Sequence, residues 1–169
     1  MRSATAASMS LSMSVSVSFA LALGGLACSA GGGAGDAFVG VWQYEVGSFS
    51  FVNCGVSSTQ VPLAHSGFQL VDEAGTLVRV NPDGCRFTIV PTTARHASGV
   101  AGEQCTTHGT DSLGNPQTTV YTLTTLLLEL RPDDASQMLE VFAIDADQTT
   151  TLGTVHCEIT GNNTLDRAP

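Results

Sequence analysis

The chain has 169 residues, of which 43% are hydrophobic and 12% are charged, and this composition excludes a disordered polar chain. The charged set is unbalanced, because 15 Asp and Glu residues stand against 6 Lys and Arg residues and the formal net charge is −9. Such a chain has no basic face, so we expect it to bind neither nucleic acid nor anionic lipid head groups.

The N-terminal segment has the pattern of a secretion signal. Residues 3–35 carry no charged side chain, and their most apolar part is Met9–Leu23. Serine occupies every second position up to Ser18, and the uninterrupted apolar run is only Phe19–Leu23. This run is far shorter than the roughly 20 apolar residues that cross a bilayer. We therefore predict a signal peptide over residues 1–27 and no permanent transmembrane helix.

The end of this segment, Gly25-Leu26-Ala27-Cys28, resembles a bacterial lipobox. The resemblance implies that the Cys28 thiol carries a diacylglyceryl group and attaches the protein to a membrane through acyl chains such as palmitate. Ser29 in the second mature position implies sorting to the outer membrane of a Gram-negative cell. Cleavage by ordinary signal peptidase after Ala27 or Ala30 is the alternative, and it would release a secreted or periplasmic protein.

A short tether and one domain are expected after the cleavage site. Residues 29–35 are Ser, Ala and Gly, a composition typical of a flexible linker. We therefore predict a lipidated cysteine and tether over residues 28–35 and a single β domain over residues 36–169.

Five cysteines are present, and an odd number in an exported protein needs an explanation. If Cys28 carries the lipid, the other four can form two disulfides, as an oxidising compartment favours. Their spacing does not suit a zinc site. Four cysteines allow three pairings, and the order of the expected strands favours Cys85 with Cys105, which leaves Cys54 with Cys157.

Hydrophobic residues after Asp36 alternate with a period of two, which is typical of strands. The turn signals Asp72-Glu73-Ala74-Gly75 and Asn81-Pro82-Asp83-Gly84 predict two hairpins. In chain order, the expected strands are Phe38–Val46, Phe49–Cys54, Gly67–Val71, Thr76–Val80, Cys85–Val90, Thr118–Leu130, Met138–Ile144 and Thr154–Thr160.

Three further expectations concern the C-terminal half. Strict alternation over Thr118–Leu130 places Val120, Thr122, Thr124, Leu126, Leu128 and Leu130 on one face. A short helix beginning at Pro132 competes with the strand Met138–Ile144, which its β-prone residues favour. Residues Gly161–Pro169 are read as a polar tail. The chain is thus predicted to be all-β, an antiparallel barrel or sandwich of about eight to nine strands.

The motif Gly40-Val41-Trp42 on the first expected strand is similar to the opening of the lipocalins. That resemblance implies a small barrel whose tryptophan plugs the closed end, with an arginine near the last strand lying across it; Arg167 is the candidate. It also implies a small apolar ligand in the barrel mouth. A tryptophan that serves only core packing is the competing interpretation.

A broader resemblance covers most of the chain. The features that carry it are the lipobox, the glycine tether, Phe38–Trp42, Cys54, Asp83-Gly84-Cys85, Gly102–Cys105 and the terminal Cys157 strand. In this layout the chain resembles secreted lipoproteins of myxobacteria and related high-GC bacteria. This resemblance implies export and a barrel, and it implies no particular activity.

The sequence lacks the motifs of common catalytic sites. It contains no Gly-x-Ser-x-Gly elbow and no phosphate-binding loop before a helix. The alternating oxygens of Asp145–Thr149 lack the glycine and glutamate of an EF-hand loop, so they are read as solvated loop acids. The histidines are far apart, at His65, His96, His108 and His156. We therefore predict no catalytic residues, no metal and no cofactor.

Two functions remain as hypotheses. One is a lipid-anchored structural or interaction module that binds a protein partner; the other is a carrier of a small apolar ligand in the barrel. A hydrolase would be favoured instead if the fold brought His65 or His156 within hydrogen-bond reach of a serine and an aspartate in one pocket.

Overall fold

The computed structural model describes residues 33–54, 56–60, 66–111 and 114–169, all of which belong to one unit, Gly31–Pro169. The predicted signal peptide (1–27), Cys28 and His65 lie outside the described residues. Within those ranges the chain forms a short 3-10 helix and ten strands, and no α-helix. The elements are η1 (Asp36–Phe38), β1 (Gly40–Cys54), β2 (Val56–Gln60), β3 (Gly67–Glu73), β4 (Thr76–Val80), β5 (Arg86–Pro91), β6 (His96–Gly99), β7 (Gln104–Thr110), β8 (Pro116–Leu130), β9 (Gln137–Thr150) and β10 (Gly153–Arg167).

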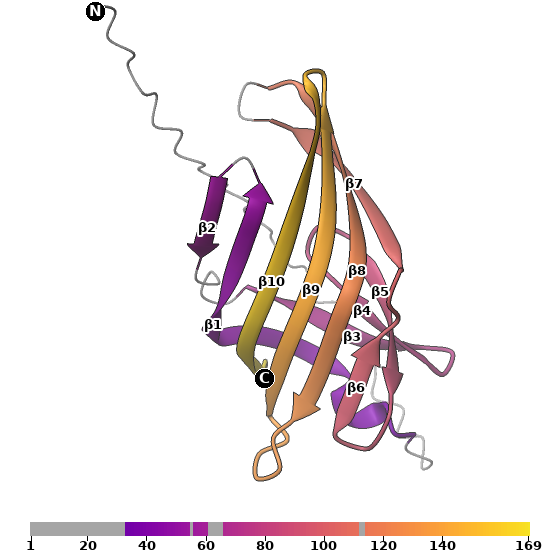
Figure 1. The fold of residues 1–169 in the computed structure, drawn as a ribbon. Helices are drawn as coiled ribbons and strands as arrows, with labels where there is room; N and C mark the ends of the chain where they lie inside the picture. The colour runs from indigo at the N-terminus through magenta and orange to yellow at the C-terminus, as the bar shows by residue number, and fades with distance from the viewer. Residues whose placement is uncertain (1–32, 55, 61–65, 112–113) are drawn as a thin grey trace, which may run out of the picture. The chain divides into compact units, whose positions relative to one another are not determined.

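Eight of these strands close into a ring. Neighbouring strands pair in the order β1-β3-β4-β5-β6-β8-β9-β10, and β10 pairs back onto β1. Residues 40–43 of β1 pair with β3, while Trp42–Val52 pair with β10, so β1 joins the two ends of the sheet. The predicted all-β antiparallel fold is confirmed, and the barrel alternative is the observed one (Figure 1).

Long strands continue beyond the ring as an open sheet. The end of β1 pairs with β2, and residues 116–122 of β8 pair with β7, whereas Leu127–Glu129 of β8 pair with β6. We call β2, β7 and the adjoining residues 48–54, 116–123, 144–150 and 153–159 the upper sheet, and the remaining paired residues the closed ring. Figure 1 shows the upper sheet above the ring.

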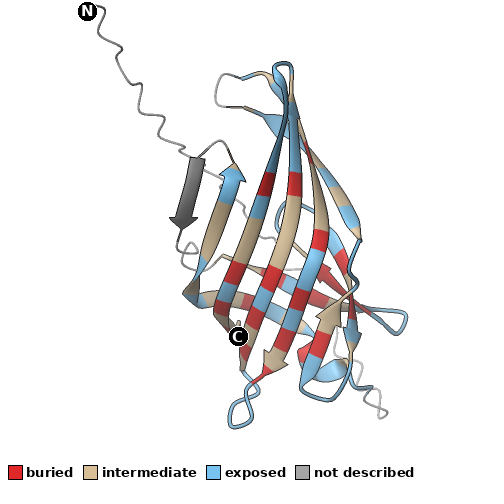
Figure 2. Ribbon diagram, in the orientation of Figure 1, coloured by how far each residue is buried: buried red, intermediate tan, exposed pale blue. Residues whose placement is uncertain are grey.

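The closed ring encloses the hydrophobic core. Side chains that alternate along the strands are buried towards its interior, as the period of two requires. Buried positions are concentrated where the ring closes and become sparse in the upper sheet (Figure 2). The largest fully buried side chains are Trp42, Phe38, Leu70, Ile89, Leu123, Leu126, Leu128, Leu130, Met138, Leu165, Glu140 and Asn163.

A bulge in β8 changes which residues of that strand face the interior. Leu123 pairs with Ile144 and Thr125 pairs with Ala143, so one extra residue, Thr124, is inserted. An inserted residue turns the alternation over. The buried positions therefore pass from Leu123 to Leu126, and the prediction that residues 120–130 keep one face was wrong.

Three strands are longer than the alternation predicts. The two expected strands up to Cys54 form one continuous strand, β1. β9 continues to Thr150 and takes up Asp145 and Asp147, which were read as loop acids. β10 continues to Arg167, so the reading of residues 161–169 as a polar tail was wrong. Polar residues are tolerated in these strands because they face outward or bond to partners within the barrel.

The predicted hairpins and the region around Pro132 follow the preferred interpretations. Gly75 N–H donates to Asp72 Oδ1 over 2.7 Å, and Ala74 and Gly75 both have positive φ, as a tight hairpin turn needs. Residues 131–136 form a turn between β8 and β9, where a helix was the alternative.

Two disulfides cross-link the upper sheet. Cys54 at the end of β1 is bonded to Cys157 of β10, with 4.5 Å between their Cα atoms. Cys85, next to the β4–β5 turn, is bonded to Cys105 with a Cα separation of 5.5 Å. Both pairs are those that the strand order favoured, although Cys105 lies inside β7 and not beyond the end of a strand.

Candidate functional site

One end of the closed ring is capped by an indole and a guanidinium. Trp42 is fully buried, and its Nε1 donates to the carbonyl of Phe38 in η1 over 2.8 Å. The Cζ of Arg167 lies 4.7 Å from the Trp42 ring, and Arg167 also donates to the carbonyl of Ala37. Strand pairing causes this contact, since Trp42 and Arg167 are direct partners between β1 and β10. The arginine thus lies across the tryptophan, a cation–π arrangement.

A charged pair is buried at the centre of the ring. Arg79 of β4 forms an ion pair with Glu140 of β9, and only 7% and 0% of their side chains are exposed. Asn163 of β10 donates to Glu140 Oε2 over 2.9 Å. Arg79 also donates from Nη2 to Tyr44 Oη over 3.3 Å. Four strands therefore converge on one hydrogen-bonded network, which compensates the cost of burying two charges.

An aromatic ring covers the guanidinium. The Cζ of Arg79 lies 3.9 Å from the ring centroid of Phe68, and its Nε donates to Asn81 Oδ1 over 2.8 Å. Most of its donors are occupied, so the guanidinium is held in one place.

Ionisation in this network is set by burial and by the charge pair. Burial raises the pKa of Tyr44, and the neighbouring Glu140 carboxylate raises it further. Burial is the largest single influence on Arg79 and lowers its pKa, but Glu140 and Tyr44 together raise the pKa by more, so the net pKa is raised. At neutral pH, Tyr44 is therefore a neutral phenol and Arg79 a cation neutralised by Glu140. The network is suited to holding the barrel together or to hydrogen bonding, and not to accepting a proton at Tyr44.

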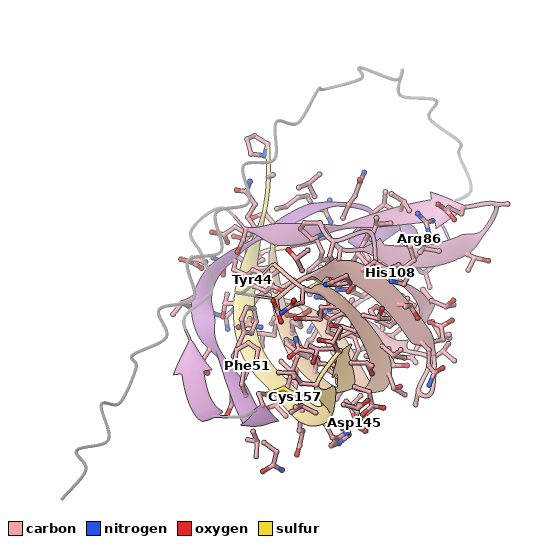
Figure 3. All side chains as sticks on the ribbon, turned by 90° about the horizontal axis from the view of Figure 1, so that it is seen from above. Tyr44, Phe51, Arg86, His108, Asp145 and Cys157 are labelled. Carbon is pink, nitrogen blue, oxygen red and sulfur yellow. A yellow bond between two sulfur atoms is a disulfide. The ribbon has the colours of Figure 1, made fainter. Side chains whose placement is uncertain are left out.

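Half-buried aromatic and aliphatic side chains lie next to this network, towards the upper sheet. Tyr44 and Phe49 meet edge to face with centroids 5.3 Å apart, and Phe49 lies 5.7 Å from Phe142. Tyr121, Ile144 and Ile159 pack against the same core. Seen from above, side chains occupy the space that the strands enclose (Figure 3).

Tyr121 extends this inner surface onto β8. Burial raises its pKa, and the charge of Asp83 in the β4–β5 turn adds to that effect. The phenol therefore stays neutral and remains a hydrogen-bond donor above ordinary physiological pH.

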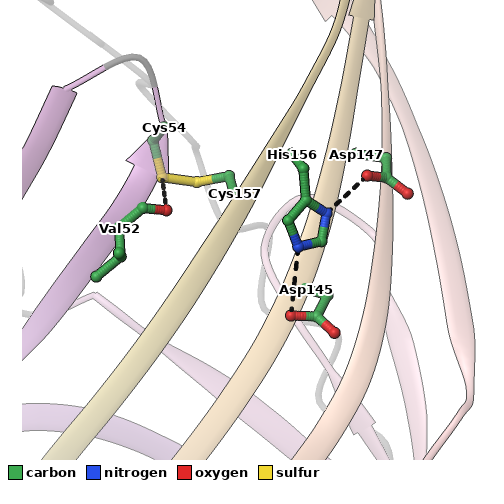
Figure 4. Close-up of a disulfide and its surroundings, with 6 residues drawn as sticks. All are labelled: Val52, Cys54, Asp145, Asp147, His156 and Cys157. Atoms are coloured by element: carbon green, nitrogen blue, oxygen red, sulfur yellow. Dashed lines mark hydrogen bonds and ion pairs between the residues drawn. A yellow bond between two sulfur atoms is a disulfide. The ribbon is translucent and has the colours of Figure 1, made fainter.

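Among the described residues, the structure brings together one His–Asp cluster, on the outer face of the upper sheet (Figure 4). His156 Nδ1 lies 2.9 Å from Asp147 Oδ1, and His156 Nε2 lies 3.9 Å from Asp145 Oδ1. The hydrogen bond with Asp147 raises the pKa of His156. Because 59% of the His156 side chain is exposed, the cluster is a solvated surface feature and does not meet the condition set for a hydrolase pocket.

The remaining histidines and acids are also placed by the fold. His96 and His108 are exposed, on β6 and β7. Asp145 and Asp147 face outward from β9, which corrects their reading as loop residues. Within the described ranges, no group of three or more His, Cys, Asp or Glu residues could hold a metal ion.

A shallow groove of about 430 Å³ crosses the outer face of β1, β10, β9 and β8. Polar and apolar side chains line it together, among them Ser48, Ser50, Thr125, Val141, Phe142, Thr160 and Asn162. None of the described residues that line this groove is charged, so it offers only weak polar contacts.

Sequence reasoning missed the buried network. Its signal was nevertheless present, because a charge at an inward position of an alternating strand is rarely tolerated without a partner. Arg79 follows Leu77 by two residues, and Glu140 stands between Met138 and Phe142 at the same spacing. The alternation therefore identifies both as inward, but it does not show that they meet.

In the part of the chain that the structure describes, no helix is long and apolar enough to span a membrane. Comparison with models of known protein families, with curated proteins and with solved structures found no match.

Proposed function

We propose that this protein is an exported lipoprotein, tethered to the outer membrane through Cys28, whose barrel acts as a non-catalytic structural or interaction module. The observation that carries the proposal is the packed hydrophobic core of the closed ring. Large side chains are fully buried there, and the buried Arg79–Glu140 charges neutralise each other. A barrel built in this way presents outer surfaces and strand edges to partners.

Two observations support export, one from the N-terminal sequence and one from the disulfides. Residues 3–35 have the pattern of a secretion signal followed by a lipobox-like motif and a glycine tether. The two disulfides suit an oxidising compartment outside the cytoplasm.

Labelling with an alkyne analogue of palmitate in a Gram-negative host tests the tether. We expect the wild-type protein to be labelled and to sediment with outer membranes, and Cys28→Ser to be unlabelled. Ser29→Asp is the matched control for sorting, because it keeps the lipid and is expected to shift the protein to the inner membrane. Unlabelled mature wild-type protein would refute the tether.

A carrier of a small apolar ligand is the second candidate. It is favoured by the half-buried side chains of Phe49, Tyr121, Ile144 and Ile159, which lie on the inner face of the upper sheet and pack against the core. The position of Arg167 over Trp42 is the arrangement that the lipocalin resemblance implies. Such a ligand would lie on the apolar surface with its polar group towards Tyr44.

Titration with a dansyl-labelled fatty acid separates the two functions. The interaction module predicts no saturable binding to the mature protein. The carrier predicts one binding site that Ile159→Glu removes, because this residue faces inward. Thr160→Glu is the matched control, since the adjacent side chain faces outward and should leave binding unchanged.

A further inference from the structure

β7 is a rim strand of the upper sheet. It pairs with β8 through all seven of its residues, from Gln104 to Thr110, and within the described ranges it pairs with no other strand. In Figure 1 it runs along the edge of the sheet beside β8. One side of its backbone is therefore left without a ladder.

The direction of the backbone groups follows from the hydrogen bonds at both ends of β7. Leu123 N–H donates to the Glu103 carbonyl over 2.8 Å, and Asp111 N–H donates to the Asn115 carbonyl over 2.9 Å. The residues on the β7 side of these two bonds, Glu103 and Asp111, are odd-numbered. Along a strand, the N–H and C=O groups of successive residues point alternately to its two sides. The N–H and C=O groups of the even-numbered residues therefore point away from β8, at Gln104, Thr106, His108 and Thr110.

The side chains of β7 do not cover this edge, and β5 lies beside only its beginning, where Thr88 N–H donates to the Glu103 side chain. Gln104 Nε2 donates to Thr122 Oγ1 over 3.1 Å, and His108 Nδ1 lies 3.2 Å from Thr118 Oγ1. Both contacts draw side chains towards β8. The strand contains no Lys, Arg, Asp, Glu or Pro, which are the residues that usually protect an edge from pairing.

Both ends of β7 are fixed. The Cys85–Cys105 disulfide ties its beginning to the β4–β5 turn. After its end, Asn115 donates from N and Nδ2 to the two carboxylate oxygens of Asp111, over 2.8 and 3.0 Å. An edge held in this way is ordered before a partner arrives, which lowers the entropy cost of pairing.

The acidic side chains around β7 indicate the charge of a partner that could pair with it. Glu103 and Asp111 flank β7, Asp83 lies close to Tyr121 of the adjoining strand, and the whole chain has a formal net charge of −9. A second copy of the chain would be repelled, whereas a basic segment would be attracted.

We propose that β7 is a docking edge that takes an extended, basic polypeptide segment of a partner protein as an additional strand. Main-chain hydrogen bonds to the even-numbered residues supply the affinity, and the acidic surroundings select the partner. This inference rests on the proposed role as an interaction module and names the surface and the chemistry of its partner.

The probe is a fluorescein-labelled nine-residue peptide that alternates lysine and valine, added to the mature protein. Thr106→Pro removes one outward N–H and leaves the bonds to β8 in place. We expect it to weaken binding about tenfold, since one ladder bond is lost and the peptide carbonyl that would accept it is left without a partner. Thr106→Val is the matched control, because it keeps the N–H and should bind as the wild type does. A glutamate–valine peptide should not bind.

Hydrogen exchange on the wild-type protein tests the same geometry without a variant. The amides of Thr106 and His108 should exchange fast in the free protein and become protected when the lysine–valine peptide is added. The amides of Thr107 and Gly109 should be protected throughout. Equal binding by Thr106→Pro and wild type, or no new protection at Thr106 and His108, would overturn the proposal.

Two other outcomes distinguish failure of this docking proposal from failure of the proposed lipid anchor. Sedimentation that shows a dimer, dissociated by Thr106→Pro, would make a second copy the occupant and overturn the basic partner. Failure of palmitate labelling would refute the tether alone, because the exchange experiment does not depend on lipidation.

Discussion

The closed ring and the upper sheet share four strands, β1, β8, β9 and β10, yet they are stabilised differently. In the ring, both edges of the sheet meet, and large side chains such as Trp42 and Leu165 are completely buried. In the upper sheet, β2 and β7 form open edges, and most side chains on β7 are exposed.

In the upper sheet, where few apolar side chains are buried, disulfides supply part of the stability. Cys54–Cys157 and Cys85–Cys105 each attach a strand of the upper sheet to a neighbouring element. A half-exposed sheet buries too little apolar surface to hold its rim strands by packing alone. Packing and ion pairing therefore hold the ring, while cross-links hold the upper sheet.

Removing one charge of the buried pair should have the largest effect on the ring. Glu140→Leu leaves Arg79 buried without a counter-charge, and we expect a loss of about 3–5 kcal/mol in the free energy of unfolding. The double variant Arg79→Met/Glu140→Leu should recover most of this loss. Urea unfolding measures both.

The matched control in the upper sheet is Glu158→Leu, because Glu158 is exposed on the outer face of β10. Its free energy of unfolding should stay close to that of the wild type. A similar loss at Glu140 and Glu158 would contradict the distinction between the two regions.

Removal of the Cys85–Cys105 disulfide should loosen β7 more than the ring. The double variant Cys85→Ser/Cys105→Ser opens a link across a separation of 20 residues, and we expect a loss of about 2–4 kcal/mol. Amide hydrogen exchange should become faster at Thr107 and Gly109 through local opening of β7. The amide of Leu128 should still exchange only through global unfolding of the domain. Uniform acceleration in both regions would show that the rim is not held separately.

Two glycines test packing density in the two regions. A Cβ at Gly161 would lie 2.2 Å from Cε1 of the buried Phe142 ring, so Gly161→Ala should cost about 1–3 kcal/mol. A Cβ at Gly109 of β7 meets nothing within 4 Å, so Gly109→Ala should be neutral or slightly stabilising. Thermal unfolding of both variants measures the difference, and equal losses would contradict it.

The smallest effect is expected at His156. Its pKa is raised above the usual 6.5 by the hydrogen bond with Asp147, so NMR titration should find a higher value that Asp147→Asn lowers. A raised pKa in the folded state means that this group contributes stability below pH about 6.5. The contribution is lost as pH rises through the raised pKa. An unshifted His156 in the wild type would contradict the pairing.

Alternation and turn residues were sufficient to predict most of the closed ring. Leu77 and Arg79 alternate in β4, and the turn at Ala74 and Gly75 sets the register of its hairpin. β7 was not predicted, because a rim strand with threonine, histidine and glycine has no apolar alternation. The face of β8 was mispredicted because the bulge at Thr124 depends on pairing with β9.

The candidate site was predicted in its parts and not as an assembly. Trp42 and Arg167 were both singled out from the sequence, although Arg167 was assigned to a tail and lies in β10. Glu140 and Asn163 were not identified, since a single charge or amide in a strand reveals its partner only when distant strands are placed side by side.

The sequence by itself determined the strand-rich fold class, the two tight hairpins and the number of cysteines free to pair. These depend on local backbone preferences and on a period of two, which neighbouring residues are enough to specify. Only the tertiary structure decided that β1 joins both ends of the sheet, that Arg79 meets Glu140, and that β7 is left at a rim. Each of these depends on which distant segments share a ladder, and the packing of the whole chain selects that arrangement.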